Sequence, residues 1–315
     1  MILSTLDKSR KGGAYEQIPS LVLGQRWTPQ LNSRNMMKVV LCVWIEPYIE
    51  TDLSFCVWPV HTPTTSKEVL TLSASTSPLP YTGNKSCIVN TILSVMPKHT
   101  VYIDPCMGSA EVFFRKPRAE KEILNDYNGD LVNLFRVIQN NEKLAYLLGR
   151  LYLSINGELA FKQNKDRLKG VPNILDDVIE TSQIFYDASW EDIQNAAAFL
   201  ENQVYSFSST GQTFGIARRD MSQRLPRLMS AYNRIRDAII LHRDYKDVIT
   251  YAACPGSFIL LDPPYKGTED MYSKANFDIE QHDILFSFMS EVNQQHHGEV
   301  KFLITYNNGP YILSL

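Results

Sequence analysis

The stretch VYIDPCMGSAEVFF, residues 101–114, decides the fold. It opens with the apolar run Val101–Ile103, which is typical of a buried strand. The segment Asp104–Ala110 follows, with a proline, a glycine and small residues that favour a tight turn. Apolar side chains return at residues 112–114, as expected at the start of a buried helix. The stretch therefore predicts a strand, a tight turn and a helix.

The same order of elements repeats along the chain. Glu122–Leu124 is a second short strand, and the apolar spacing of Leu131, Leu134, Phe135 and Ile138 indicates a helix. Strand, helix, strand and helix in this order predict a parallel sheet with crossover helices. Three further apolar runs predict the remaining strands of an α/β fold: Ile239–Leu241, Phe258–Leu261 and Val300–Ile304.

Residues 141–239 interrupt the sheet with helical patterning. Apolar periodicity predicts helices within residues 144–151, 174–185, 196–205 and 225–235. We therefore expect residues 78–140 and 240–315 to form one catalytic domain, into which residues 141–239 are inserted as a helical subdomain.

Residues 1–77 differ in composition from the rest of the chain. Proline, serine and threonine are frequent, and Thr62–Ser66 and Ser73–Pro80 are typical of linkers. Short strands are indicated only at Val39–Ile45 and Phe55–Val60. We expect an unassigned, poorly ordered N-terminal extension, with an unfamiliar small domain as the alternative.

Composition excludes several classes of protein. The 315 residues are 44% apolar and 21% charged, which suits a globular protein, and no apolar run approaches the roughly 20 residues of a membrane helix. The five cysteines are scattered without metal-ligand or disulfide spacing, and the six histidines show no metal motif. We therefore expect a cytoplasmic protein without a metal. A net charge of −3 means that any nucleic-acid binding must depend on local charge.

The strand Phe258–Leu261 ends in Asp262-Pro263-Pro264-Tyr265, at the edge where α/β sheets bind their ligands. Two prolines stiffen the backbone and remove two N–H donors, so carbonyl acceptors remain beside a carboxylate and an aromatic ring. This cluster suits a planar substrate with an amino group. Asp262 and the Pro263 carbonyl would accept the two amine hydrogens, and Tyr265 would stack on the ring. The alternative is an ordinary turn with Tyr265 in the core.

A second candidate site begins at Gly108, where small residues let the backbone approach a ligand at the start of a helix. Asp126 follows Asp104 by 22 residues, close to the offset at which an acidic side chain meets ribose hydroxyls in nucleotide sites. The chain has no G-x-G-x-x-G and no P-loop motif, which disfavours NAD(P) and nucleoside triphosphates. S-adenosylmethionine fits, since it has a ribose and an adenine but no phosphate. Asp244, after another strand, would face the adenine or solvent.

Residues 218–243 contain seven arginines and two acidic residues. Arginine suits phosphate and guanine recognition, so the cluster indicates DNA contact. The alternative is a solvated helix face. The candidate DNA-binding residues are Arg218, Arg219, Arg224 and Arg227.

Four motifs in chain order together resemble the Dam-type, or alpha-group, DNA adenine-N6 methyltransferases. They are Pro80–Lys85, Asp104–Ala110, the strand end at Asp126 and Asp262–Tyr265. The segments Gln203–Gly215 and Leu303–Asn308 also look like parts of that family, and the resemblance covers residues 78–312.

The resemblance implies a Rossmann-like S-adenosylmethionine-dependent sheet, with residues 141–239 as the target-recognition insertion. The expected reaction transfers a methyl group to the N6 amine of an adenine flipped out of double-stranded DNA at a specific sequence. The implied catalytic residues are Asp262, Pro263, Pro264 and Tyr265. The implied cofactor-binding residues are Tyr81, Lys85, Asp104, Gly108, Asp126 and Asp262, with Lys85 near the methionine carboxylate and Tyr81 packed on the cofactor.

The motifs depart from the family pattern at three places. Cys106 stands where the family usually has an aromatic residue, Ala110 replaces a frequent glycine, and relatives usually continue beyond the point of Leu315. Two alternatives therefore stay open: a methyltransferase for another planar amine in RNA or protein, and a truncated, non-catalytic DNA-binding remnant. We expect a monomer. The sequence leaves open a cognate restriction endonuclease as partner, as against an orphan or phage enzyme.

Overall fold

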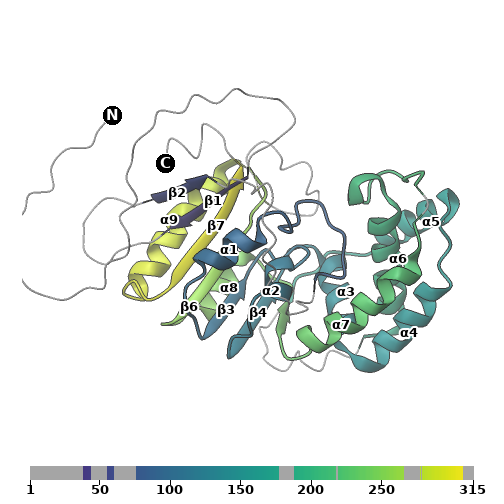
Figure 1. Ribbon diagram of the computed structural model, residues 1–315, viewed down its shortest axis with the longest axis horizontal. Helices are drawn as coiled ribbons and strands as arrows, with labels where there is room; N and C mark the ends of the chain where they lie inside the picture. The colour runs from purple at the N-terminus through teal and green to yellow at the C-terminus, as the bar shows by residue number, and fades with distance from the viewer. Residues whose placement is uncertain are drawn as a thin grey trace, which may run out of the picture. The chain divides into compact units, whose positions relative to one another are not determined.

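The computed structural model describes residues 38–43, 55–59, 76–176, 188–217, 219–265, 277 and 279–307, all within one compact unit, Met36–Leu315. Seven strands form one sheet in the order β2-β1-β7-β6-β3-β4-β5 (Figure 1). Five of them run parallel: β3 (Val101–Asp104), β4 (Lys121–Asn125), β5 (Ile239–Leu241), β6 (Ser257–Leu261) and β7 (Lys301–Asn307). The expected α/β fold with a parallel sheet is confirmed.

Two strands come from the N-terminal segment. β1 (Lys38–Val43) pairs antiparallel with β7, so that Lys38 lies opposite Asn307, and β2 (Phe55–Pro59) pairs antiparallel with β1. The sheet therefore includes residues that precede the boundary expected at residue 78. The physical reason is that β7 would otherwise leave a row of unpaired backbone groups at the sheet edge. Residues 1–37 lie outside the described residues.

Helices cover both faces of the sheet. Tyr102 and Phe258 face one core with the first group of helices, whereas the adjacent Ile103 and Ile259 face the other, as the alternation along a strand requires. The first face carries α1 (Val89–Val95), α2 (Glu111–Arg115) and α3 (Gly129–Gln139). The second carries α8 (Tyr245–Ala252) and α9 (Ile279–Gln295) (Figure 1).

Between α3 and β5 the chain is mainly helical, as the sequence predicts. It forms α4 (Asn141–Tyr152), α5 (Glu158–Lys169), α6 (Trp190–Tyr205) and α7 (Leu225–Ile235), with 3₁₀ turns at Phe207–Ser209 and Met221–Arg224. α3 packs against α6 and α7, so these helices share one continuous core with the first face of the sheet. This continuity arises because α3 is buried on both the sheet side and the helical side.

Within residues 141–239, two helix predictions differ from the structure. The sequence misses α5, because Phe161 and Leu168 are its only buried residues and the apolar period is weak. The helix expected at residues 174–185 does not begin by residue 176, and residues 177–187 lie outside the described residues.

Among the described helices, none is both long enough and apolar enough to cross a membrane.

Candidate active site

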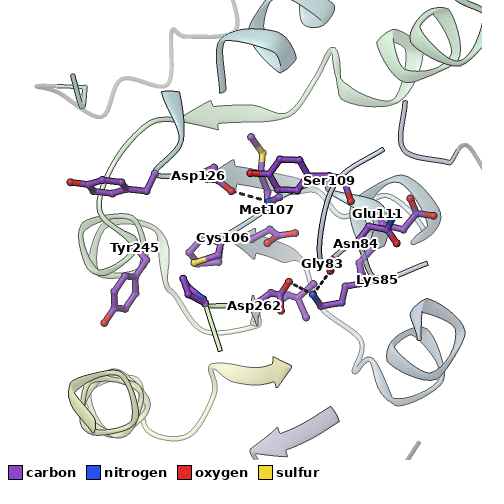
Figure 2. Close-up of a pocket in the computed structure, with 18 of the residues that line it drawn as sticks. Gly83, Asn84, Lys85, Cys106, Met107, Ser109, Glu111, Asp126, Tyr245 and Asp262 are labelled. Carbon is purple, nitrogen blue, oxygen red and sulfur yellow. Dashed lines mark hydrogen bonds and ion pairs between the residues drawn. The ribbon is translucent and has the colours of Figure 1, made fainter. Parts of the chain in front are cut away.

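A pocket lies at the carboxyl ends of the parallel strands, where the sequence places its motifs. Its lining comes from segments far apart in the chain: Tyr81–Lys85, Asp104–Ser109, Asp126–Tyr127, Arg243–Tyr245 and Asp262 among them. In Figure 2 the side chains of Asp126 and Asp262 are drawn on either side of Cys106. All six predicted cofactor-binding residues line this pocket.

Asn125, the last residue of β4, fixes the loops around the pocket. Its side-chain nitrogen donates to the carbonyls of Pro105 at 2.8 Å and Arg243 at 2.9 Å, and its side-chain oxygen accepts the Arg243 N–H at 2.9 Å. One buried amide thus joins the loops that follow β3 and β5 to the end of β4. The sequence shows Asn125 only as the residue before Asp126, so its role could not be predicted.

Asp126 holds the glycine loop. Its Oδ2 accepts the Gly108 N–H at 2.9 Å, and its Oδ1 accepts the Asn128 N–H at 2.9 Å. Gly108 has a φ of 48°, in the left-handed region that favours glycine, and Tyr81 lies against it. Burial raises the pKa of Asp126 to about 6, although the backbone donors stabilise its charged form. The carboxylate can still accept further hydrogen bonds, since each oxygen has two lone pairs.

Asp104 is the most deeply buried acid of the pocket. Only 2% of the residue is exposed, and its Oδ2 accepts a hydrogen bond from the Tyr102 hydroxyl at 2.9 Å. Burial raises the pKa of Asp104 to about 8, and the charges of Asp262 and Asp126 raise it further against the Tyr102 hydrogen bond. With Asp126 and Asp262, and with Glu111 and Asp244 described below, the pocket lining includes five acidic residues, an environment that suits a cationic ligand.

Asp262 follows β6 and forms an ion pair with Lys85, whose Nζ also donates to the Gly83 carbonyl at 2.7 Å (Figure 2). Lys85 is buried, with 7% of its side chain exposed, so it is not a solvated surface lysine. The Asp262 carboxylate also accepts hydrogen bonds from Thr305 at 2.5 Å and from the Tyr265 hydroxyl at 3.2 Å. Contact of Lys85 with a methionine carboxylate stays a prediction.

The rest of the Asp262–Tyr265 motif divides between pocket and core. Pro264 lines the pocket, whereas Pro263 is buried and is not among the lining residues. The Tyr265 ring packs against Tyr306, with 5.6 Å between the ring centroids, and joins the second core at its margin. Stacking of Tyr265 on a substrate ring stays a prediction.

Three further lining residues were missed or left open by the sequence. Glu111 lines the pocket while it accepts the Ser77 N–H at 3.2 Å and the Arg115 Nε–H at 2.7 Å. Asp244 lines the pocket and accepts the Lys246 N–H at 2.9 Å, which caps α8. Burial raises the pKa of the Cys106 thiol, so this lining residue is a poor nucleophile.

Only some of the arginines in residues 218–243 are exposed on the surface. Arg234 is buried and paired with Glu122, at 2.8 Å from Nη2 to Oε1, and Arg243 donates to the Asp176 carbonyl. These two arginines are held by contacts within the fold, and neither is among the four predicted DNA-binding residues.

The remaining arginines near α7 do form a positive cluster. Burial lowers the pKa of Arg224, and the nearby charges of Arg227 and Arg219 lower it further. Arg227 is exposed, whereas Arg219 donates to the Val204 carbonyl at 2.6 Å. Arg218 lies outside the described residues.

Comparison with known proteins finds several similar relatives, among them the following three. A DNA N-6-adenine-methyltransferase of Escherichia phage P1 is 25% identical over 252 residues, which are 75% of this chain and 30% of that protein. The modification methylase LlaI of Lactococcus lactis subsp. lactis is 21% identical over 240 residues, 70% of this chain and 36% of that protein. The type II methyltransferase M1.LlaDCHI of Lactococcus lactis subsp. cremoris is 23% identical over 192 residues, 59% of this chain and 64% of that protein.

This chain spans about a third of the length of the first two relatives. The model of one protein family, the D12 class N6 adenine-specific DNA methyltransferases, matches residues 81–315. That range contains three of the four motifs in full, all of the Pro80–Lys85 motif except Pro80, and every predicted catalytic and cofactor-binding residue. The chain therefore belongs to the D12 class of N6 adenine-specific DNA methyltransferases.

Proposed function

We propose that this chain transfers a methyl group from S-adenosylmethionine to the N6 amine of adenine, flipped out of double-stranded DNA at a specific sequence. One observation carries the proposal. The carboxylate of the Asp262–Tyr265 motif and the Gly108–Asp126 pair line the same pocket, so a carboxylate suited to an amine and one suited to ribose hydroxyls would face the same ligand. Membership of the D12 class supports adenine N6 methylation as the reaction carried out in this pocket.

The pocket residues fit S-adenosylmethionine. Asp126 would accept the ribose hydroxyls with the lone pairs that Gly108 and Asn128 leave free. Asp126 and Asp262 supply negative charge for a ligand that carries a sulfonium and an ammonium group, and Asp104 adds a buried carboxyl group beside them. Tyr81, against Gly108, would pack on the ligand. When bound, the cofactor supplies an activated methyl group.

The residues around Asp262 would orient the adenine amine. The lone pair of that nitrogen is delocalised into the ring, so the amine is a poor nucleophile until its hydrogens are held. The Asp262 carboxylate and the Pro263 carbonyl would accept these two hydrogens and aim the nitrogen at the methyl group. Alignment of two bound reactants contributes roughly 7 to 11 kcal/mol, more than the roughly 3 to 5 kcal/mol of general-base help. No covalent intermediate is required.

DNA would meet the cluster of Arg219, Arg224 and Arg227. Exposed guanidinium groups bind phosphates and base edges, and Arg227 is exposed on α7. Arg218 is proposed as a fourth contact from its place in the sequence. Flipping the adenine out of the duplex costs a few kcal/mol, which contacts of this kind would offset.

The proposal is tested with purified protein and S-adenosylmethionine that carries a labelled methyl group. Adenine-containing duplex DNA, RNA and a mixed protein fraction are offered separately, and the digested products are analysed by mass spectrometry. We expect the label in N6-methyladenine from DNA. Label in RNA or protein alone would instead support a methyltransferase for another planar amine, and label in none of the three would support a non-catalytic protein.

A further inference from the structure

The strand β7 brings a buried hydroxyl to the proposed catalytic carboxylate. Leu261 of β6 pairs with Ile304 of β7 in parallel register, so the next residues, Asp262 and Thr305, are neighbours at the carboxyl edge of the sheet. Thr305 is completely buried, and its hydroxyl donates to Asp262 Oδ1 at 2.5 Å. No motif of the sequence assigns Thr305 a role.

The two carboxylate oxygens of Asp262 have different hydrogen-bond partners. Oδ1 accepts hydrogen bonds from Thr305 and from the Tyr265 hydroxyl, which fill both of its lone pairs. Oδ2 accepts from the Lys85 ammonium, and 24% of the Asp262 side chain is exposed. One oxygen is therefore anchored in the protein, while the other has a lone pair left for a ligand in the pocket.

We propose that Thr305 is a positioning residue, which anchors Oδ1 of Asp262 so that Oδ2 receives the hydrogen of the substrate amine. The inference rests on the proposed function and specifies Oδ2 as the oxygen that accepts the hydrogen bond from the substrate amine. The Lys85 ammonium group, which like the substrate amine is an N–H donor, contacts Oδ2 and shows that this oxygen accepts hydrogen bonds from nitrogen on the pocket side.

The chemistry of the two side chains supports this division. Rotation about the terminal torsion of an aspartate is broad, so an unanchored carboxylate samples many orientations. Thr305 lies in a strand and is β-branched, with few side-chain conformations available, which makes its hydroxyl a rigid donor. An amine held in one orientation reacts faster than one that follows a rotating acceptor.

The test replaces Thr305 by valine, which has nearly the same shape and no hydroxyl. We expect kcat for adenine methylation to fall at least about tenfold, since a hydrogen bond to a charged group is lost, while the affinity for S-adenosylmethionine stays within about twofold. Thr305→Ser keeps the donor and is expected to restore kcat to within about threefold of the original. Rescue by serine separates positioning of the carboxylate from packing of the strand.

Ile304→Val is the matched control. Ile304 is the neighbouring residue of the same strand, fully buried in the second core, and it faces away from Asp262. Its truncation is expected to lower the melting temperature slightly without changing kcat. If Thr305→Val does not fold, Thr305→Cys provides the test, because a thiol keeps the volume with a weaker donor, and an intermediate kcat is expected.

Each outcome decides between the two claims. A chain with the original sequence that methylates no adenine refutes the proposed function itself. An active original chain together with an equally active Thr305→Val variant overturns the role of Thr305 and leaves the function standing. Equal losses of kcat in the valine, serine and isoleucine-to-valine variants would show that β7 acts only through packing, which also overturns the inference.

Discussion

Cofactor affinity should depend on Asp126 and on its protonation. The carboxylate already accepts the Gly108 and Asn128 N–H groups, each at 2.9 Å, and would use its remaining lone pairs for the ribose hydroxyls. A hydrogen bond to a charged group contributes roughly 1.5 to 3 kcal/mol, and about 1.4 kcal/mol is a factor of ten in affinity. Replacing Asp126 by alanine should therefore weaken S-adenosylmethionine binding at least about tenfold.

The pH dependence gives a second measure of the same residue. Burial raises the pKa of Asp126 to about 6, and the charged form is the one that accepts ribose hydrogens. At pH 5 only about one tenth of the free protein would have this group ionised, so affinity should be about tenfold lower than on the plateau above pH 7. Asp104 ionises at a higher pH, with a pKa of about 8, so the range from pH 5 to 7 reports on Asp126.

Isothermal titration calorimetry with S-adenosylmethionine from pH 5 to 7 measures both effects. Asp126→Asn is the matched variant, because it keeps an acceptor for one backbone N–H and cannot ionise. We expect its affinity to be lower at pH 7 and flat across this range. Unchanged affinity in Asp126→Ala, or the same pH slope in Asp126→Asn, would refute the assignment of Asp126.

Two other predictions concern the charges of the molecule. Burial raises the pKa of Asp104 from 3.8 to about 8, so its contribution to stability is fully present below about pH 4 and is lost as pH rises through 8. Asp104→Asn should therefore raise the melting temperature of the cofactor-free protein at pH 9 by a few degrees, and no gain at that pH would argue against a repelled, buried charge. Arg224→Gln combined with Arg227→Gln should reduce the slope of log affinity for DNA against log salt by about one to two, whereas Arg236→Gln, close to Asp237 at the other end of α7, should not. A slope that stays the same in the double variant would show that this cluster is a solvated helix face.

The five parallel strands could be predicted because each is a short apolar run that ends in, or is followed by, a polar residue. Asp262 was predicted to line the ligand-binding edge because the carboxyl ends of parallel strands meet there, Asp126 was predicted from its spacing after Asp104, and Asp104 was implied by the family resemblance. The structure places all three in one pocket. A local sequence pattern is enough to predict a residue's environment when that environment follows from the residue's position along a strand.

Long-range pairing limited the remaining predictions. The role of Asn125 depends on loops at residues 105 and 243, and that of Thr305 on the register between β6 and β7, neither of which a local pattern reveals. The same holds for Arg234, because a count of charges cannot show that Glu122 lies opposite it in the core. Likewise, β1 joins the parallel strands of the sheet by pairing with β7, which lies more than 200 residues later in the chain.

The central claim is that Asp262 directs methyl transfer to adenine N6, and methylation of DNA in cells tests it most directly. DNA from cells that express the original chain or Asp262→Ala is sequenced by a method that detects N6-methyladenine, with folding of the variant checked by circular dichroism. The account predicts N6-methyladenine at one recurrent sequence with the original chain and none with Asp262→Ala, while Asp262→Asn, which keeps one acceptor, retains measurable methylation. Equal methylation by a folded Asp262→Ala variant would contradict the account.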